Sequence, residues 1–271
     1  MVGQDLDDWQ ALGGGSFVLR SSAARALVNI GLVVGSERAL VIDTGCGPRH
    51  GAEILAAVRA VTALPLVVVN THAHWDHFFG NAVFRQDGVN PSEAQHDGER
   101  HRGGPDFWAH AAAARTMAET GESQRVFVGG PEPEMAAGVG VGTEIVVPSL
   151  LVGERPGADG RVETSVELDL GGIVVDLFTL GRGHTDGDLM VGAPGVLFAG
   201  DVLEEGAPPS FDDSYPAEWV AVLRRLAGMS GKYPVMIPGH GRPVDATFAA
   251  AMADIMETGG PGKTGGLVPA G

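Results

Sequence analysis

The most informative stretch of this 271-residue chain reads T-H-A-H-W-D-H over residues 71–77. It follows the apolar run L-V-V-V at 66–69, which is typical of a short buried strand. In an extended segment that leaves a strand, residues two apart point the same way, so His72 and His74 can bind one cation. Asp76 and His77 lie beyond the expected bend and can face a second cation. Imidazole nitrogens and carboxylate oxygens are the donors of catalytic zinc sites, so the stretch predicts a metal site.

A surface loop that happens to be rich in histidine is the alternative explanation. This chain has 9 histidines, and the spacing H-x-H-x-D-H would arise in it by chance at odds on the order of one in a thousand. We therefore favour the metal site.

Three further candidate ligands have small neighbours and follow predicted strands. His184 lies in G-R-G-H-T-D-G-D at 181–188, Asp201 ends F-A-G-D at 198–201, and His240 lies in P-G-H-G at 238–241. Carboxyl ends of strands are where α/β sheets place their sites, and glycine lets backbones approach a ligand closely. Alone, each motif is equally typical of an ordinary turn. Together with residues 71–77, they predict a shared metal centre.

Each half of the chain shows the same order of predicted elements: several strands, a helix, a strand and a helix. We expect strands at 16–20, 27–34, 39–43, 66–69, 144–147, 164–170, 173–180, 189–192, 196–199 and 235–237. We expect helices at 54–61, 108–119, 219–226 and 248–256. No linker-like composition separates the halves. We therefore predict one domain over residues 1–258, with a polar insertion at 85–106 and a flexible Gly-rich tail at 259–271.

Composition narrows the function classes. Apolar residues make up 44% of the chain, enough for a substantial core, and the net charge of −16 disfavours nucleic acid as a partner. The only cysteine is Cys46, and the acidic start of the chain does not resemble a secretory signal, so we expect a cytoplasmic protein. No stretch is apolar enough to span a membrane. A small molecule is the expected partner, and the sequence carries no signal for an oligomeric state.

In their order along the chain, the four motifs resemble those of the metallo-β-lactamase-fold hydrolase superfamily, over roughly residues 16–257. The resemblance implies an α/β protein, an αββα sandwich of two mixed β-sheets flanked by helices. It implies two metal sites that share a bridging Asp201: one metal is held by His72, His74 and His184, the other by Asp76, His77 and His240. The early V-I-D-T-G at 41–45 also resembles a family motif, in which Asp43 either supports the metal loops or simply caps a turn.

The resemblance further implies a hydrolase with two Zn²⁺ ions, for which iron or manganese is the alternative metal. Two ions about 3.5–4 Å apart lower the pKa of a bridging water towards about 7, so a hydroxide can attack a carbonyl carbon. Asp76 is the expected catalytic residue, because it orients its metal. Esters, thioesters and lactones are the expected substrates.

Other activities share the fold. Persulfide dioxygenases use one iron with much of this motif set, whereas the full set of Asp76, His77 and His240 favours two metals. True metallo-β-lactamases usually carry cysteine or serine where Asp201 stands, and flavodiiron proteins usually carry glutamate where His74 stands. A non-catalytic binding module would not need seven intact ligands. A nuclease is disfavoured by the charge of −16.

The remaining candidates have simpler explanations. We expect His110 to pack at a helix start, and His96 and His101 to be solvated in the insertion, with a substrate contact as the alternative. We expect Cys46 to be a small core residue. Arg182 is either a surface charge or a group that binds an anionic substrate.

Overall fold

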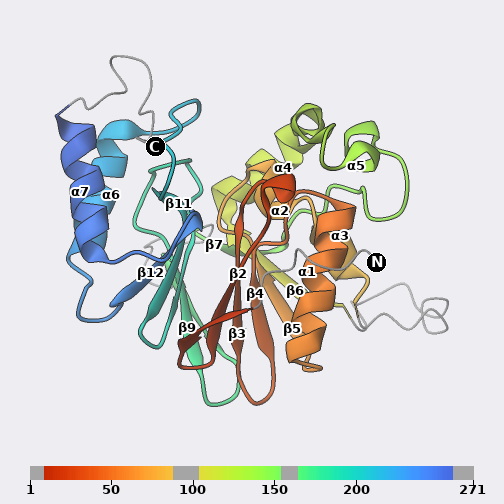
Figure 1. Cartoon of the computed structure of the whole chain (residues 1–271), viewed down its shortest axis with the longest axis horizontal. Helices are drawn as coiled ribbons and strands as arrows, with labels where there is room; N and C mark the ends of the chain where they lie inside the picture. Colours follow the sequence, from red (N-terminus) through yellow and green to blue (C-terminus); the bar gives the residue numbers. More distant parts are fainter. Residues whose placement is uncertain (1–8, 88–103, 154–163, 259–271) are drawn as a thin grey trace.

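Two β-sheets face each other, and helices cover the outer face of each sheet (Figure 1). This arrangement comes from a computed structural model that describes residues 9–87, 104–153 and 164–258. The predicted αββα sandwich is therefore confirmed.

The first sheet has seven strands in sequence order. Its strands are β1 (Gln10–Gly13), β2 (Ser16–Arg20), β3 (Asn29–Val34), β4 (Ala39–Ile42), β5 (Leu66–Val69), β6 (Asp106–His110) and β7 (Leu150–Val152). Strands β1 to β4 pair antiparallel, and β4 to β7 pair parallel. Because β4 to β7 run in one direction, their carboxyl ends meet at one edge of the sheet.

The second sheet has five strands in the order β12-β11-β10-β9-β8. They are β8 (Ser165–Asp169), β9 (Val174–Phe178), β10 (Met190–Ala193), β11 (Val196–Glu204) and β12 (Val235–His240). Only β11 and β12 pair parallel, so this sheet is mixed as well.

Helices α1 (Pro48–Val61) and α3 (Asn81–Arg85) lie on the side of the first sheet, and α6 (Pro216–Ala227) and α7 (Ala246–Glu257) cover the second (Figure 1). The shorter α2 (Trp75–Phe78), η2 (Arg125–Val128) and α5 (Pro133–Ala137) gather near α4 (Ala111–Gln124). A 3-10 turn, η1 (Ala23–Arg25), precedes β3.

Alternation along the strands explains this layering. Leu40 and Ile42 of β4 join the core between the sheets, whereas Val41 packs with Ile54 and Val58 of α1. Successive side chains of a strand point to opposite faces, and both faces of these strands are covered. The strands therefore read as continuous apolar runs rather than as alternating patterns.

Two predicted elements were wrong. The helix expected from residue 108 begins only at Ala111, because Phe107 and Ala109 are buried side chains of β6, which extends the parallel sheet beside β5. Residues 144–147 do not form a strand: the carbonyl of Val146 accepts a hydrogen bond from Asn81 Nδ2, and the strand comes later, at Leu150–Val152.

Some predictions stay untested. Arg85 ends α3 and Asp106 begins β6, and most of the predicted insertion between them, with His96 and His101, lies outside the described residues. So does the tail at 259–271. The single domain and the cytoplasmic location remain predictions. Within the described part of the chain, no helix is both long and apolar enough to cross a membrane.

Candidate metal centre

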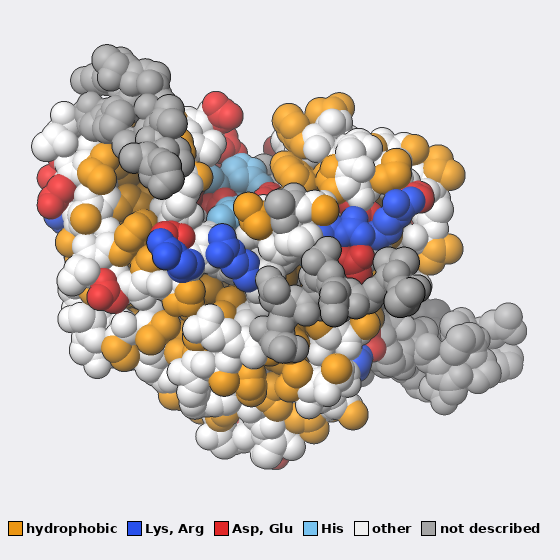
Figure 2. All heavy atoms as spheres, in the orientation of Figure 1, with side chains coloured by type: hydrophobic (Ala, Val, Ile, Leu, Met, Phe, Trp, Pro, Cys, Tyr) orange, Lys and Arg blue, Asp and Glu red, His pale blue; other side chains and the backbone are white. Residues whose placement is uncertain are grey.

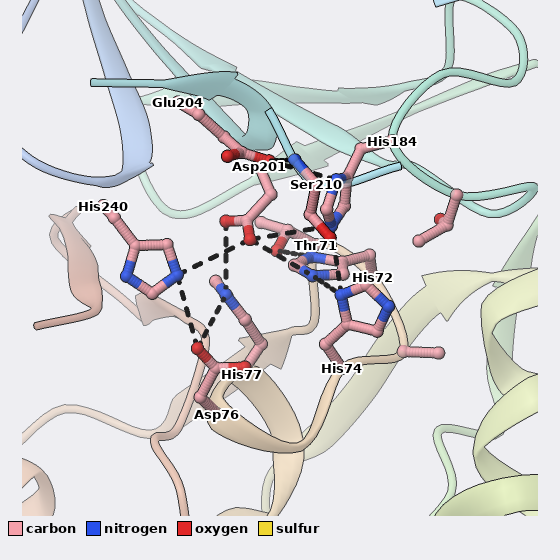
Figure 3. Close-up of polar contacts among 12 residues, drawn as sticks. Thr71, His72, His74, Asp76, His77, His184, Asp201, Glu204, Ser210 and His240 are labelled. Atoms are coloured by element: carbon pink, nitrogen blue, oxygen red, sulfur yellow. Dashed lines mark hydrogen bonds and ion pairs between the residues drawn. The ribbon is translucent and has the colours of Figure 1, made fainter. Parts of the chain in front are cut away.

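Seven side chains from both sheets converge at one edge of the sandwich (Figure 3). They form two groups whose ligand atoms lie within 4.8 Å of one another: His72, His74, His184 and Asp201 in the first, and Asp76, His77 and His240 in the second. Both groups depend on strand ends. The loop after β5 and helix α2 supply the motif at 71–77, the loop after β9 supplies His184, and β11 and β12 supply Asp201 and His240.

The first group, the His72 group, points three imidazole nitrogens at one another. His74 Nδ1 lies 3.1 Å from His72 Nε2 and 3.0 Å from His184 Nε2. Asp201 Oδ2 lies 3.8 Å from His72 Nε2 and 3.6 Å from His184 Nε2. Four potential donor atoms thus surround one small volume.

The outer nitrogens of these rings face acceptors, which decides where the ring protons lie. His74 Nε2 lies 3.0 Å from Asp213 Oδ2, and His184 Nδ1 lies 3.3 Å from Glu204 Oε1. His72 Nδ1 lies 3.1 Å from the hydroxyl oxygen of Thr71. The Thr71 hydroxyl donates its own hydrogen to Asp43 Oδ2, so its oxygen is free to accept from His72. With protons on these outer nitrogens, the three inner nitrogens carry lone pairs.

Three lone pairs this close repel one another unless a cation lies between them. The residues therefore fit a bound metal ion better than any network of neutral hydrogen bonds. The carboxylates behind His74 and His184 also match the carboxylate–histidine–metal arrangement that orients metal ligands in proteins.

The second group, the His77 group, has Asp201 as its neighbour. His77 Nε2 lies 3.3 Å from Asp201 Oδ1, and His240 Nε2 lies 3.3 Å from Asp76 Oδ2 and 3.5 Å from Asp201 Oδ2. One carboxylate oxygen of Asp201 thus faces His77, while the other faces His240 and the His72 group. This position suits a bridging ligand.

Gly239 makes the approach of Asp201 possible. A Cβ at Gly239 would overlap the Oδ1 atom of Asp201, so a larger residue would push the carboxylate away. The strand register between β11 and β12 is irregular here. We had expected Asp201 to follow the end of a strand, but it lies inside β11.

Asp43 supports the loop from behind. It has a positive φ of 65° and is 1% exposed. Its Oδ1 accepts the backbone N–H of Thr71 at 2.8 Å, and its Oδ2 accepts the Thr71 hydroxyl at 2.8 Å and lies 2.7 Å from His77 Nδ1. Asp43 therefore both caps the loop and leaves the lone pair of His77 on Nε2, towards Asp201.

The charges in the centre are strongly coupled. Burial opposes protonation of His77, but Asp201, Asp76 and Asp43 outweigh burial and raise its pKa well above the usual range. His240 behaves alike, with its pKa raised to about 10 against burial, chiefly by Asp201. Burial lowers the pKa of His72 well below the usual range, and the neighbouring histidines lower it further. The side chains around His77 and His240 thus create a negative potential that favours positive charge.

Three acidic residues of the site were not picked out from the sequence, although Asp188 ends the motif at 181–188. Asp213 comes from the loop after β11 and Glu204 ends that strand, and each faces a histidine of the His72 group. Asp188 is buried, and it accepts hydrogen bonds from the backbone N–H and the hydroxyl of Thr185, which shapes the loop that carries His184. Burial raises the pKa of Asp188 to about 6.

The other candidates lie away from the centre. His110 is the N-cap of α4, where its Nδ1 accepts the N–H of Ala112 at 3.2 Å. Cys46 is buried with its Sγ 3.4 Å from His50 Nδ1, and burial raises the pKa of the thiol to about 12, so it is a protonated core residue. Arg182 forms two hydrogen bonds with Glu218 at the surface.

A groove of about 830 Å³ opens over both groups. Figure 2 shows histidine side chains in a hollow between two lobes of the molecule, with acidic side chains beside them. Trp75 and Phe127 line the groove on the side of α2 and η2, and Tyr215 lines it near Asp213. Asp76, His74, His184 and His240 all reach this surface, so a small molecule can reach the candidate ligands.

Fold and site together define a class of protein. Residues 24–240 match the model of the metallo-beta-lactamase superfamily, and the chain belongs to that family. It is a metal-dependent hydrolase. Solved structures agree on the fold: a metallo-beta-lactamase from Pontibacter korlensis superposes with a TM-score of 0.65 at 17% identity, covering 92% of this chain and 98% of that one. FIM-1 from Pseudomonas aeruginosa, in its mono-zinc form, gives 0.66 at 19% identity, covering 94% and 96%.

Sequence relatives are more specific. Acyl-coenzyme A thioesterase MBLAC2 of Bos taurus and that of Homo sapiens are each 29% identical to this chain over 257 residues, covering 86% of this chain and 81% of the relative. MBLAC2 of Gallus gallus is 42% identical over 72 residues, a match that covers 24% of this chain and 26% of that protein.

Proposed function

We propose that this chain is a dinuclear zinc hydrolase that cleaves a carbonyl substrate, with thioesters as the first class to test and esters and lactones as further classes. The observation that carries the proposal is the position of Asp201, whose two carboxylate oxygens face different groups of imidazole nitrogens. The similarity to proteins named as acyl-coenzyme A thioesterases supports the choice of thioesters.

In this proposal, His72, His74 and His184 would hold one ion, Asp76, His77 and His240 would hold the other, and Asp201 would serve as the shared ligand. Two bound divalent ions supply Lewis-acid activation of water and of a carbonyl oxygen. The chain itself orients the ligands: Asp43, Glu204 and Asp213 face outer nitrogens of three histidines. Asp76 lines the groove, and in this proposal its carboxylate would help to orient the attacking water.

Metal analysis and turnover test the proposal together. Protein purified without chelator should carry close to two zinc ions per chain by elemental analysis, and it should release thiol from S-butyryl-N-acetylcysteamine. Chelation should abolish turnover, and zinc should restore it. One iron per chain, with oxygen consumption on a persulfide, would replace the proposal by the dioxygenase alternative.

A panel narrows the substrate class. The same preparations should be tested on an aryl ester, a lactone and a chromogenic cephalosporin. Because aspartate stands at position 201, where β-lactamases usually carry cysteine or serine, we expect weak or no turnover of the cephalosporin. A kcat/KM of about 10⁶ M⁻¹s⁻¹ on it would contradict this expectation.

A further inference from the structure

The lining of the groove carries ionisable charge of one sign. Among the described residues, its wall contains no lysine or arginine, but six carboxylates: Asp76, Asp186, Asp201, Glu204, Asp212 and Asp213. They come from four segments: Asp76 from α2, Asp186 from the loop after β9, Asp201 and Glu204 from β11, and Asp212 and Asp213 from the loop after β11.

Metal ions would not cancel this charge. Two divalent ions bring +4, the ligating imidazoles are neutral, and the six carboxylates bring −6, which leaves −2. With any one of these carboxylates protonated, the sum would still be −1.

Neighbouring arginines are engaged outside the groove. Arg182 forms hydrogen bonds of 2.9 and 2.5 Å with Glu218, and its guanidinium lies 4.1 Å from the centre of the Tyr215 ring. Arg242 is paired with Glu205 at 3.0 Å. Neither arginine belongs to the groove lining, so neither offsets the carboxylates there.

A second observation also indicates that the groove receives positive charge. Aromatic rings of Trp75 and Phe127 share the lining. Aromatic faces attract cations, most strongly when water is excluded.

We propose that this groove selects acyl substrates whose leaving group, close to the scissile bond, is uncharged or cationic, and rejects leaving groups that are anionic there. The inference rests on the proposed hydrolase function and adds the charge of the substrate to it. Asp186 and Asp212 are the residues we assign to this selection, because they line the groove without facing a candidate metal ligand at hydrogen-bond distance among the described residues.

Three butyryl thioesters with leaving groups of similar length test the proposal. They are the thiocholine ester, which is cationic, the N-acetylcysteamine ester, which is neutral, and the 3-mercaptopropionate ester, which is anionic. In low salt, we expect kcat/KM to be at least about tenfold higher for the cationic than for the anionic ester. In 0.5 M NaCl, the ratio should shrink because screening lengths fall well below 10 Å.

Variants assign the effect to the groove. Asp212→Asn and Asp186→Asn should each lower the ratio of cationic to anionic turnover by a few-fold. Glu167→Gln is the matched control: it removes one carboxylate from the exposed side of β8 and should leave the ratio unchanged. A ratio of one or less in the parent protein, or the same ratio in all variants, would overturn the proposal.

Binding separates this inference from the proposed activity. The S-butyl thioethers of the same three thiols cannot be hydrolysed, and calorimetry gives their affinities for the zinc-loaded protein. If no thioester is hydrolysed but the cationic thioether binds at least about tenfold more tightly than the anionic one, the activity fails and the charge inference stands. If the anionic thioether binds as well as the cationic one, the charge inference fails whatever the activity.

Discussion

His50 and His77 are both buried, at 2% and 0% exposure, but their pKa values move in opposite directions. His50 lies in α1 with its Nδ1 facing the Cys46 thiol, and burial lowers its pKa to about 4. His77 is just as buried, but Asp201, Asp76 and Asp43 outweigh burial and raise its pKa well above the usual range.

The contrast shows what burial alone does and what a built site adds. Burial disfavours the charged imidazolium, so a histidine in an ordinary core stays neutral. Carboxylates arranged around the ring reverse this preference for the neutral form. Such buried ion pairs add little to the stability of a core, so packing alone does not explain them. The His77 group therefore has the electrostatics of a cation site, whereas the surroundings of His50 have those of core packing.

Asp201→Asn should have the largest effect. The substitution keeps the shape of the side chain but removes the negative charge that both groups share. Losing a ligand should cost at least the roughly 10–100-fold that is typical of residues one layer further out, so we expect a loss of metal affinity of at least about 100-fold. The His77 group should lose its ion first. Competition with a fluorescent chelator measures this, and retention of both ions with full activity would show that the ligand assignment is wrong.

Asp43→Asn should have the next largest effect. Asparagine tolerates the positive φ at this position and still accepts the N–H of Thr71, but its amide N–H₂ would face the donors of His77 and the Thr71 hydroxyl. We expect metal affinity to fall by about 10–100-fold and the chelated protein to lose about 1–3 kcal/mol of unfolding free energy. An unchanged affinity alongside reduced stability would indicate that Asp43 only caps the loop.

The pKa of His50 predicts an acid-sensitive fold. Its folded value of about 4 lies below the unfolded value of 6.5, so the unfolded chain binds more protons between these limits. The buried, neutral His50 therefore costs the folded state nothing above pH 6.5, but the free energy of unfolding decreases as the pH falls from 6.5 towards 4. At pH 5, we expect a loss of about 2 kcal/mol relative to pH 7.

Urea titrations of the chelated protein at pH 7 and pH 5 test this expectation. Glutamine at position 50 does not titrate, so in His50→Gln the difference in unfolding free energy between pH 7 and pH 5 should shrink by about 2 kcal/mol. The pKa of His77 is raised rather than lowered, so His77 should not destabilise the fold over this pH range. Equal differences in parent and variant would mean that His50 titrates normally.

His110→Ala should have the smallest effect on the metal centre. The ring caps α4, so its removal should cost about 0.5–2 kcal/mol of stability. Metal content should be unchanged, and turnover should remain within about tenfold of the parent. If elemental analysis instead shows the loss of an ion, the ligands have been taken from the wrong histidines.

The sequence was most informative where the deciding residues are close neighbours. Wholly apolar runs such as 66–69 predicted buried strands correctly, because both faces of those strands are covered. It failed where a short strand runs directly into a helix: Phe107 and Ala109 precede an alanine-rich segment, whose helical pattern extended our prediction back over β6. The exposed β1 was missed because only sheet pairing with β2 makes it a strand.

The same distinction applies to the site. The motif at 71–77 and the glycine-flanked His184, Asp201 and His240 could be picked out from the sequence, because each has a local pattern, and the structure brings all seven side chains together. Their role as metal ligands stays a prediction. Asp213 had no such pattern, since 139 residues separate it from His74.

The charge of the groove was decided by the tertiary structure alone. A net charge of −16 says nothing about which of the 34 acidic residues surround the site. That depends on how the loops after β9 and β11 fold over the strand ends, and this in turn depends on contacts such as that of the Tyr215 N–H with the carbonyl of Gly183. Motif residues are adjacent in the chain and keep their spacing in any fold, whereas an electrostatic potential sums over residues that only packing brings together.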